Sequence, residues 1–197
     1  MLQIHIGHGD LRESQCLPPV LYSGDPLPPL IMCCDVVHPT IVKTVLWPDE
    51  RATGAFAARL ATLPALHNAF IAIDGELGAG KTTLVRHLLR ALGVTGRIKS
   101  PTYAVVEPYT LEQLAVWHFD FYRFNDPREW EDAGFRDIFA SPGLKLAEWP
   151  DKAADCLPTP DLSLQLTVAD DESRQVRLSA HSVTGHALLV AALETSP

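Results

Sequence analysis

The strongest chemical signal in the chain is a glycine-rich loop at residues 75–82. Gly75 and Gly80 are separated by four positions, and Lys81 and Thr82 follow at once, which is the spacing of a phosphate-binding P-loop. Glycines let successive backbone N–H groups face one phosphate cluster, the lysine places a positive charge on the terminal phosphates, and the hydroxyl can ligate Mg²⁺. The residues expected to hold a nucleotide here are Gly75, Glu76, Leu77, Gly78, Ala79, Gly80, Lys81, Thr82 and the adjoining Thr83.

The sequence on both sides of this loop has the pattern that a P-loop requires. Residues 68–74 are a short apolar run typical of a buried parallel strand, and they lead directly into the loop. Residues 82–92 have apolar side chains at helical spacing, and Gly93 predicts the end of that helix. A helix that begins at the loop presents the positive end of its dipole to an anion. The context therefore favours nucleotide binding over a simple glycine turn.

Two carboxylates stand at the ends of predicted strands downstream. Asp120 lies at the end of the strand predicted near 114–121, and Glu148 follows the strand predicted at 144–147. A P-loop protein needs such a carboxylate near the phosphates to hold magnesium and to orient water. We therefore predict that Lys81, Glu148 and Asp120 are catalytic, and that Thr82, Glu148 and Asp120 lie at the metal. The chain has no guanine-reading Asn-Lys-x-Asp motif, which favours ATP over GTP.

Further elements are expected along the rest of the chain. Strands are predicted at 41–46, 103–108, 162–168 and 175–180, and helices at 49–63, from Asp126 onward, and at 186–193. Six prolines interrupt residues 1–40, so we expect either a poorly ordered N-terminal extension or a translation start placed too far upstream. Residues 41–197 are predicted to form a single domain.

Composition and charge limit the class of protein. Apolar residues make up 47% of the 197 and charged residues 20%, as in ordinary globular proteins, and the formal net charge is −8. A negative charge argues against strong, direct binding of nucleic acid, because such proteins usually have a basic face. No apolar run is long enough to span a bilayer and no signal peptide is apparent. The four cysteines form no Cys-x-x-Cys pair, so a reduced, cytoplasmic protein without membrane attachment is expected.

Three short motifs after the P-loop are more specific than the P-loop itself. They are Lys-Ser-Pro-Thr-Tyr at 99–103, His-Phe-Asp-Phe-Tyr-Arg at 118–123, and Glu-Trp-Pro at 148–150. In this order and spacing, residues 43–180 closely resemble the TsaE (YjeE) family of bacterial tRNA threonylcarbamoyladenosine biosynthesis ATPases. The resemblance implies an α/β protein with a compact P-loop NTPase fold, whose small, mixed and mainly parallel sheet is flanked by helices. The first 40 residues fall outside it.

The resemblance also implies a function and partners. Members of the family act with ATP and Mg²⁺ in the machinery that places threonylcarbamoyl on the adenosine beside the anticodon. They bind a heterodimer of the threonylcarbamoyltransferase subunit and its pseudo-enzyme partner, so contact with tRNA is expected to be indirect. ATP hydrolysis there resets the transferase between rounds. Because the chain shows no arginine finger, whose charge is worth about 10³–10⁵ in rate, we expect slow intrinsic turnover that rises when the partner docks.

The resemblance assigns roles to further residues. Ser100 and Thr102 are expected on a loop that senses the γ-phosphate, and Trp149 beside the nucleotide site. Two roles stay open for Arg123, which either contacts phosphate or pairs with Asp120. Glu50, Thr53 and Arg174 are expected near the adenine.

Two other functions are compatible with the P-loop. A small-molecule kinase shares the strand, loop and helix, but it usually has an arginine-rich lid, and residues 124–142 contain only Arg128 and Arg136. The other function is a nucleotide-gated adaptor for which hydrolysis is incidental.

Overall fold

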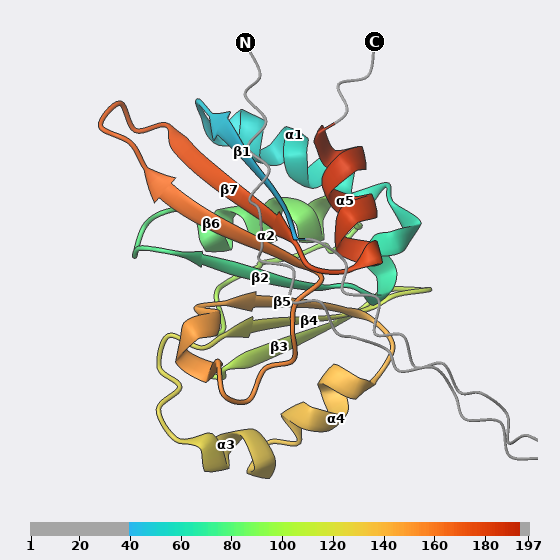
Figure 1. Ribbon diagram of the computed structural model, residues 1–197. Helices are drawn as coiled ribbons and strands as arrows, with labels where there is room; N and C mark the ends of the chain where they lie inside the picture. Colours follow the sequence, from blue (N-terminus) through green and yellow to red (C-terminus); the bar gives the residue numbers. More distant parts are fainter. Residues whose placement is uncertain (1–39, 194–197) are drawn as a thin grey trace, which may run out of the picture. The chain divides into compact units, whose positions relative to one another are not determined.

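The computed structural model describes residues 40–193. The expectation of a poorly ordered extension therefore falls almost wholly outside the described residues. The described part forms an α/β fold in which one mixed sheet has helices on both faces (Figure 1). Among the described residues, no helix is long and apolar enough to cross a membrane.

The sheet has seven strands in the order β1-β7-β6-β2-β5-β4-β3. The four central strands, β6, β2, β5 and β4, are parallel to one another, and antiparallel pairs flank them on both sides. The expected mixed sheet is thus confirmed, with its parallel part at the centre. The strands are β1 (Ile41–Trp47), β2 (Phe70–Gly75), β3 (Val106–Thr110), β4 (Ala115–Asp120), β5 (Leu144–Glu148), β6 (Leu162–Val168) and β7 (Arg174–Ala180).

Three longer helices cover one face of the sheet, and two short helices lie on the other. The longer ones are α1 (Glu50–Ala61), α2 (Lys81–Ala91) and α5 (Val183–Leu193). The short ones are α3 (Pro127–Asp132) and α4 (Phe135–Ala140), and the 3₁₀ turns are η1 (Pro64–Asn68) and η2 (Pro150–Ala153). The sequence did not predict α4 or the 3₁₀ turns, because each is too short to show a period of 3.6 residues.

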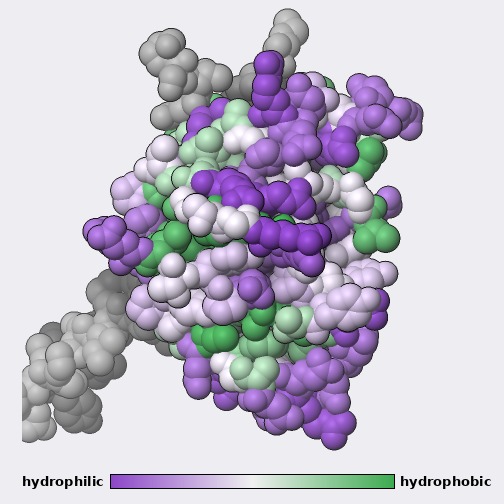
Figure 2. All heavy atoms as spheres, turned by 180° about the vertical axis from the view of Figure 1, so that it is seen from behind, coloured by the Kyte–Doolittle hydropathy of each residue, from purple (hydrophilic) through white to green (hydrophobic). Residues whose placement is uncertain are grey.

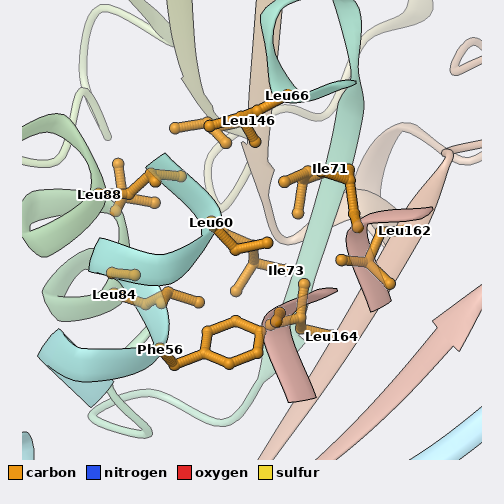
Figure 3. Close-up of a cluster of buried hydrophobic side chains, with 14 of the residues drawn as sticks. Phe56, Leu60, Leu66, Ile71, Ile73, Leu84, Leu88, Leu146, Leu162 and Leu164 are labelled. Carbon is orange, nitrogen blue, oxygen red and sulfur yellow. The ribbon is translucent and has the colours of Figure 1, made fainter. Parts of the chain in front are cut away.

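The larger apolar core lies between the sheet and helices α1 and α2. Phe56 and Leu60 of α1 and Leu84 of α2 point toward Ile71 and Ile73 of β2 (Figure 3). The alternation in β6 and β7 sends every second side chain to this core, as period-two strands must. Strand β2 is apolar on both faces because helices cover both.

A second, aromatic core lies on the opposite face of the sheet. Phe119 of β4 packs edge-on against Phe135 of α4, with ring centroids 5.4 Å apart, and Trp130 of α3 joins the same cluster. On the face of the molecule turned away in Figure 1, apolar side chains gather in small groups among hydrophilic ones (Figure 2). The two cores clamp β2, β5 and β4, and so fix the ends of the strands that carry the candidate site.

The start of β3 differs from the prediction of a strand at 103–108. Strand β3 begins at Val106, and the residues before it form a loop. Val105 has a positive φ of 64°, a conformation that a β-branched residue rarely adopts. The backbone N–H of Val105 donates to the carbonyl oxygen of Pro101 at 2.7 Å, which closes a turn before the strand. The hydroxyls of Ser100 and Thr102 both bond the carboxylate of Asp120 and hold the same segment as a loop.

Candidate functional site

The glycine-rich loop joins the end of β2 to the start of α2, in the centre of the parallel strands. Gly75 and Gly80 both have positive φ values, 143° and 106°, which residues with a Cβ rarely adopt. A Cβ at Gly75 would lie 2.4 Å from the carbonyl oxygen of Leu166 on β6. The first glycine of the loop is therefore required both by its conformation and by the close approach of the neighbouring strand.

Lys81 lies folded back inside the loop. Its Nζ donates to the carbonyl oxygens of Gly75 and Glu76, at 2.5 and 2.8 Å, and lies 3.8 Å from the centroid of the Trp149 ring. Its side chain is buried, and among the described residues no carboxylate lies within ion-pair distance of it. Burial lowers the pKa of Lys81, against the attraction of Glu148, Asp74 and Asp120. A buried cation held only by neutral groups suits a site for phosphate.

Thr82 and Glu148 meet next to this lysine. The Thr82 hydroxyl donates to Oε2 of Glu148 at 2.8 Å, and Oε1 of Glu148 lies 2.8 Å from Nε2 of His118. Glu148 is 2% exposed and ends β5. The Thr82 hydroxyl and the Glu148 carboxylate thus place two oxygen atoms side by side, and oxygen atoms are the ligands that Mg²⁺ prefers.

Asp120 ends β4, directly opposite Glu148 in the sheet register. Its Oδ2 accepts hydrogen bonds from the Ser100 and Thr102 hydroxyls, and its Oδ1 accepts one from the backbone N–H of Tyr122 at 3.0 Å. Both carboxylate oxygens thus have protein donors. In this arrangement Asp120 holds the 100–105 loop, and the oxygens of Thr82 and Glu148 are the predicted metal-side groups that lie together.

All the predicted site residues except Gly75 and Glu76 line two adjoining cavities. The larger, of about 330 Å³, is bounded by Leu77, Gly78, Gly80, Lys81, Thr82, Thr83, Ser100, Thr102, Asp120, Tyr122, Glu148 and Trp149. The smaller, of about 170 Å³, is bounded by Glu50, Thr53, Ala79, Gly80, Thr83, Leu166 and Arg174. Gly80 and Thr83 border both, so the start of α2 lies between the larger, phosphate-side cavity, which Lys81 and Thr82 line, and the smaller cavity, where the expected adenine-side residues gather.

Arg123 does not pair with Asp120, one of the two roles left open for it. Its guanidinium lies over the Tyr103 ring, 4.5 Å from the centroid, and the hydrogen-bond partners of Asp120 are two hydroxyls and a backbone N–H. Tyr103 is 85% exposed. The pair therefore connects the two loops at the edge of the larger cavity.

Two histidines gained no role from sequence reasoning alone. His118 contacts Glu148, and His87 of α2 lies with its Nε2 2.9 Å from Oε1 of Glu50. His118 precedes Asp120 by two positions on one strand, so the period of two places both on the same face. That spacing was the available signal for His118. His87 and Glu50 come from separate helices and carry no comparable signal.

No group of three or more His, Cys, Asp or Glu side chains that could hold a metal is found in residues 40–193. A P-loop magnesium site does not depend on such a group. Mg²⁺ usually keeps several waters and takes one or two protein oxygens together with phosphate oxygens, and the Thr82–Glu148 pair fits that donor set.

The parallel strands, the loop after β2, the lysine and hydroxyl at the start of α2 and the carboxylate on the adjacent strand define a protein of the P-loop NTPase class. The model of the family described as "Threonylcarbamoyl adenosine biosynthesis protein TsaE" matches residues 47–176. The chain belongs to the TsaE family.

Individual relatives agree with this assignment. The tRNA threonylcarbamoyladenosine biosynthesis protein TsaE of Haemophilus influenzae is 38% identical over 148 residues, covering 73% of this chain and 93% of that protein. The protein of the same name from Bacillus subtilis is 34% identical over 110 residues, 56% of this chain and 68% of that one. The crystal structure of Bacillus subtilis YdiB has a TM-score of 0.64 at 23% identity, covering 79% of this chain and 96% of that chain. That likeness shows the fold.

Proposed function

We propose that this protein is a Mg²⁺-dependent ATPase that acts in the threonylcarbamoyl modification of the adenosine next to the anticodon of tRNA. The observation that carries the proposal is that four separate segments meet around one cavity. They contribute Lys81 and Thr82, the Ser100–Thr102 loop, Asp120, and Glu148 with Trp149. The name that its relatives share places them in the biosynthesis of this modified nucleoside.

The residues divide the work of binding and hydrolysis. Lys81 supplies the positive charge for the terminal phosphates, and the backbone N–H groups at the start of α2 supply further donors. Thr82 and Glu148 would hold Mg²⁺, which neutralises charge on the phosphates when bound. Glu148 also lies where a carboxylate can orient a water molecule. Ser100 and Thr102 belong to the 100–105 loop, line the larger cavity and bond Asp120. This loop is therefore suited to respond to the terminal phosphate.

The second cavity supports a place for the base. Glu50, Thr53 and Arg174 converge there from α1 and β7. An adenine offers an amino donor that the Glu50 carboxylate can accept; the preference for ATP over GTP rests on the missing guanine motif.

The partner is proposed to be a heterodimer of the threonylcarbamoyltransferase subunit and its pseudo-enzyme relative, which ATP hydrolysis resets between rounds. Among the described residues no arginine lines the larger cavity: Arg123 lies over Tyr103 at its edge, and Arg174 lines the smaller cavity. Without an arginine aimed at the phosphates beside Lys81, intrinsic hydrolysis should be slow, and docking of the partner should raise it. The acidic net charge of −8 supports an indirect role toward tRNA.

The test is the threonylcarbamoyladenosine content of tRNA in cells whose only copy carries Lys81→Ala. We expect the modified nucleoside to be lost, while Lys152→Ala, a change at an exposed lysine outside both cavities, leaves it normal. Normal modification in the Lys81→Ala cells would overturn the proposal. Phosphate transfer to added nucleosides or sugars by the purified protein would instead indicate the kinase.

A further inference from the structure

His118 is a fully buried histidine with a single polar contact. It lies in β4 with 0% of its surface exposed, and its Nε2 is 2.8 Å from Oε1 of Glu148. The other ring nitrogen, Nδ1, is buried and has no hydrogen-bond partner. Buried polar groups are usually paired. The bond to Glu148 is therefore the one hydrogen bond that offsets the burial of this imidazole ring.

The donor and acceptor roles in this bond follow from the chemistry of the two groups. An ionised carboxylate can only accept hydrogen bonds, so Nε2 must carry the proton. A proton on Nδ1 would be a buried donor without a partner, which is unfavourable. The contacts therefore make Nε2–H the donor of the bond to Glu148.

The sheet fixes where this donor points. Strands β4 and β5 pair His118 with Leu146 and Asp120 with Glu148, so the histidine lies one diagonal step from the carboxylate on the same face. Both residues are in the clamped, central part of the sheet. A contact made between strands is held more precisely than one made from a loop.

Glu148 has one side-chain donor on each oxygen: His118 on Oε1 and Thr82 on Oε2. A metal ion that takes a lone pair of the Thr82 hydroxyl oxygen would lie on the Oε2 side of Glu148, because that hydroxyl donates to Oε2. The His118 bond does not lie on that side of the carboxylate, so it can persist and hold Glu148 in place.

We propose that His118 is a positioning residue for ATP hydrolysis: its Nε2–H group fixes the Glu148 carboxylate at the phosphate-side cavity. The inference rests on the proposed ATPase function. It assigns His118 no contact with nucleotide, so the loss of this donor should slow hydrolysis without weakening nucleotide binding.

The first experiment compares two substitutions at the same position. His118→Leu fills the buried position with an apolar side chain and removes the donor, whereas His118→Gln places an amide donor close to the position of Nε2. Single-turnover hydrolysis is measured with protein in excess over ATP, and affinity is measured with a fluorescent ATP analogue. We expect His118→Leu to lower the rate by roughly 10- to 100-fold, the range for loss of an outer-shell partner, with affinity unchanged and with His118→Gln recovering most of the rate.

The controls separate positioning from loss of structure. His67→Leu changes an exposed histidine in η1 and should leave rate and affinity at wild-type values. In a double-mutant cycle, adding His118→Leu to Glu148→Gln should give no further loss of rate, because the histidine acts through that carboxylate. A full additional loss, or a His118→Leu protein as fast as wild type, overturns the proposal.

The second experiment does not depend on activity. The ¹⁵N shifts of the His118 ring in nucleotide-free protein should show a protonated Nε2 and an unprotonated Nδ1, and Glu148→Ala should change them. The opposite tautomer, or shifts unaffected by Glu148→Ala, overturns the proposal. If the wild type hydrolyses no ATP, alone or with its partners, the proposed function fails, and the ¹⁵N result still decides whether His118 holds Glu148.

Discussion

The hydroxyl of Thr82 donates a 2.8 Å hydrogen bond to Glu148, across 66 residues of sequence. This bond joins the first turn of α2 to the end of β5, which is the strand beside β2. The Thr82 hydroxyl and the Glu148 carboxylate thereby lie side by side and line the same cavity as Lys81. Because Lys81 is bound to backbone carbonyls on the same loop, the phosphate side and the carboxylate side of the site are formed by the same loop–helix junction.

Glu148→Gln should separate binding from hydrolysis. The amide keeps the size of the side chain and can still contact Thr82, but it lacks the charge that orients water and supports the metal. We expect ATP to bind with little change and the single-turnover rate to fall by about 10²-fold or more. Asp151→Asn is the matched control, because Asp151 is exposed and lies three residues further along the chain, outside the phosphate-side cavity. Equal rates for Glu148→Gln and wild type would contradict the assigned role.

Lys81→Met should remove an unfavourable buried charge together with the phosphate ligand. Burial lowers the pKa of Lys81 below its ordinary value of 10.5, so the unfolded chain binds more protons than the folded chain between the lowered pKa and 10.5. The free energy of unfolding of the wild type should therefore gain a contribution from Lys81 as the pH rises through that window. The variant should lack this contribution and should not bind ATP.

Urea unfolding of nucleotide-free protein at a series of alkaline pH values measures this effect. The difference in free energy between wild type and Lys81→Met should narrow as the pH rises, whereas Lys152→Met, at an exposed position, should follow the wild type throughout. If the difference in free energy of unfolding between wild type and Lys81→Met stays constant with pH, the charge of Lys81 does not destabilise the folded protein.

Much of this fold was predictable because its signals are local. The predicted bounds of the strand before the P-loop and of the helix after it differ from the observed bounds by one or two residues. Both predictions rest on signals between neighbouring residues, namely the apolar periodicity and Gly80 at the start of α2. The placement of Glu148 and Asp120 at strand ends was also predicted correctly, because each follows a short apolar run. Their register across β4 and β5 brings them together, and parallel order alone made that expectation reasonable.

The rest depended on contacts between distant segments. His87 and Glu50 meet only because α1 packs on α2, and no local pattern records that packing. Asp120, which is expected at the metal, accepts hydrogen bonds from Ser100, Thr102 and the Tyr122 backbone, and no local sequence pattern predicted these partners. Which acceptor a hydroxyl finds is decided by the path of a loop, and the positive φ of Val105 shows that this path is not the one that residue preferences favour.

Asp120→Asn should loosen the 100–105 loop. If the amide oxygen keeps the bond from the Tyr122 N–H, the NH₂ group faces the Ser100 and Thr102 hydroxyls. Those hydroxyls can then no longer donate to this position, and the charge that strengthens their bonds is gone. We expect a destabilisation of about 1–3 kcal/mol and faster amide hydrogen exchange at residues 100–105. Asp132→Asn, at an exposed position in α3, should change neither. Unaltered exchange in the loop would mean that Asp120 does not hold it.

Two glycines of the P-loop should respond very differently to the same substitution. At Gly75 the new Cβ would meet the Leu166 carbonyl oxygen at 2.4 Å, and φ is +143°. At Gly78 φ is +83° but no atom lies within 4 Å of the new Cβ. We therefore expect Gly78→Ala to be destabilised by roughly 1–2 kcal/mol from backbone strain alone, and Gly75→Ala by clearly more, since β6 or the loop must move.

Thermal unfolding with and without ATP distinguishes the two variants. Gly78→Ala should melt a few degrees below the wild type, because roughly 1 kcal/mol lowers the Tm of a chain of this size by about 2–4 °C. Gly75→Ala should melt much lower and should show no rise in Tm when ATP is added, because the displaced loop no longer directs its N–H groups at phosphate. Equal losses for the two variants would mean that the close approach of Leu166 to Gly75 does not constrain the loop.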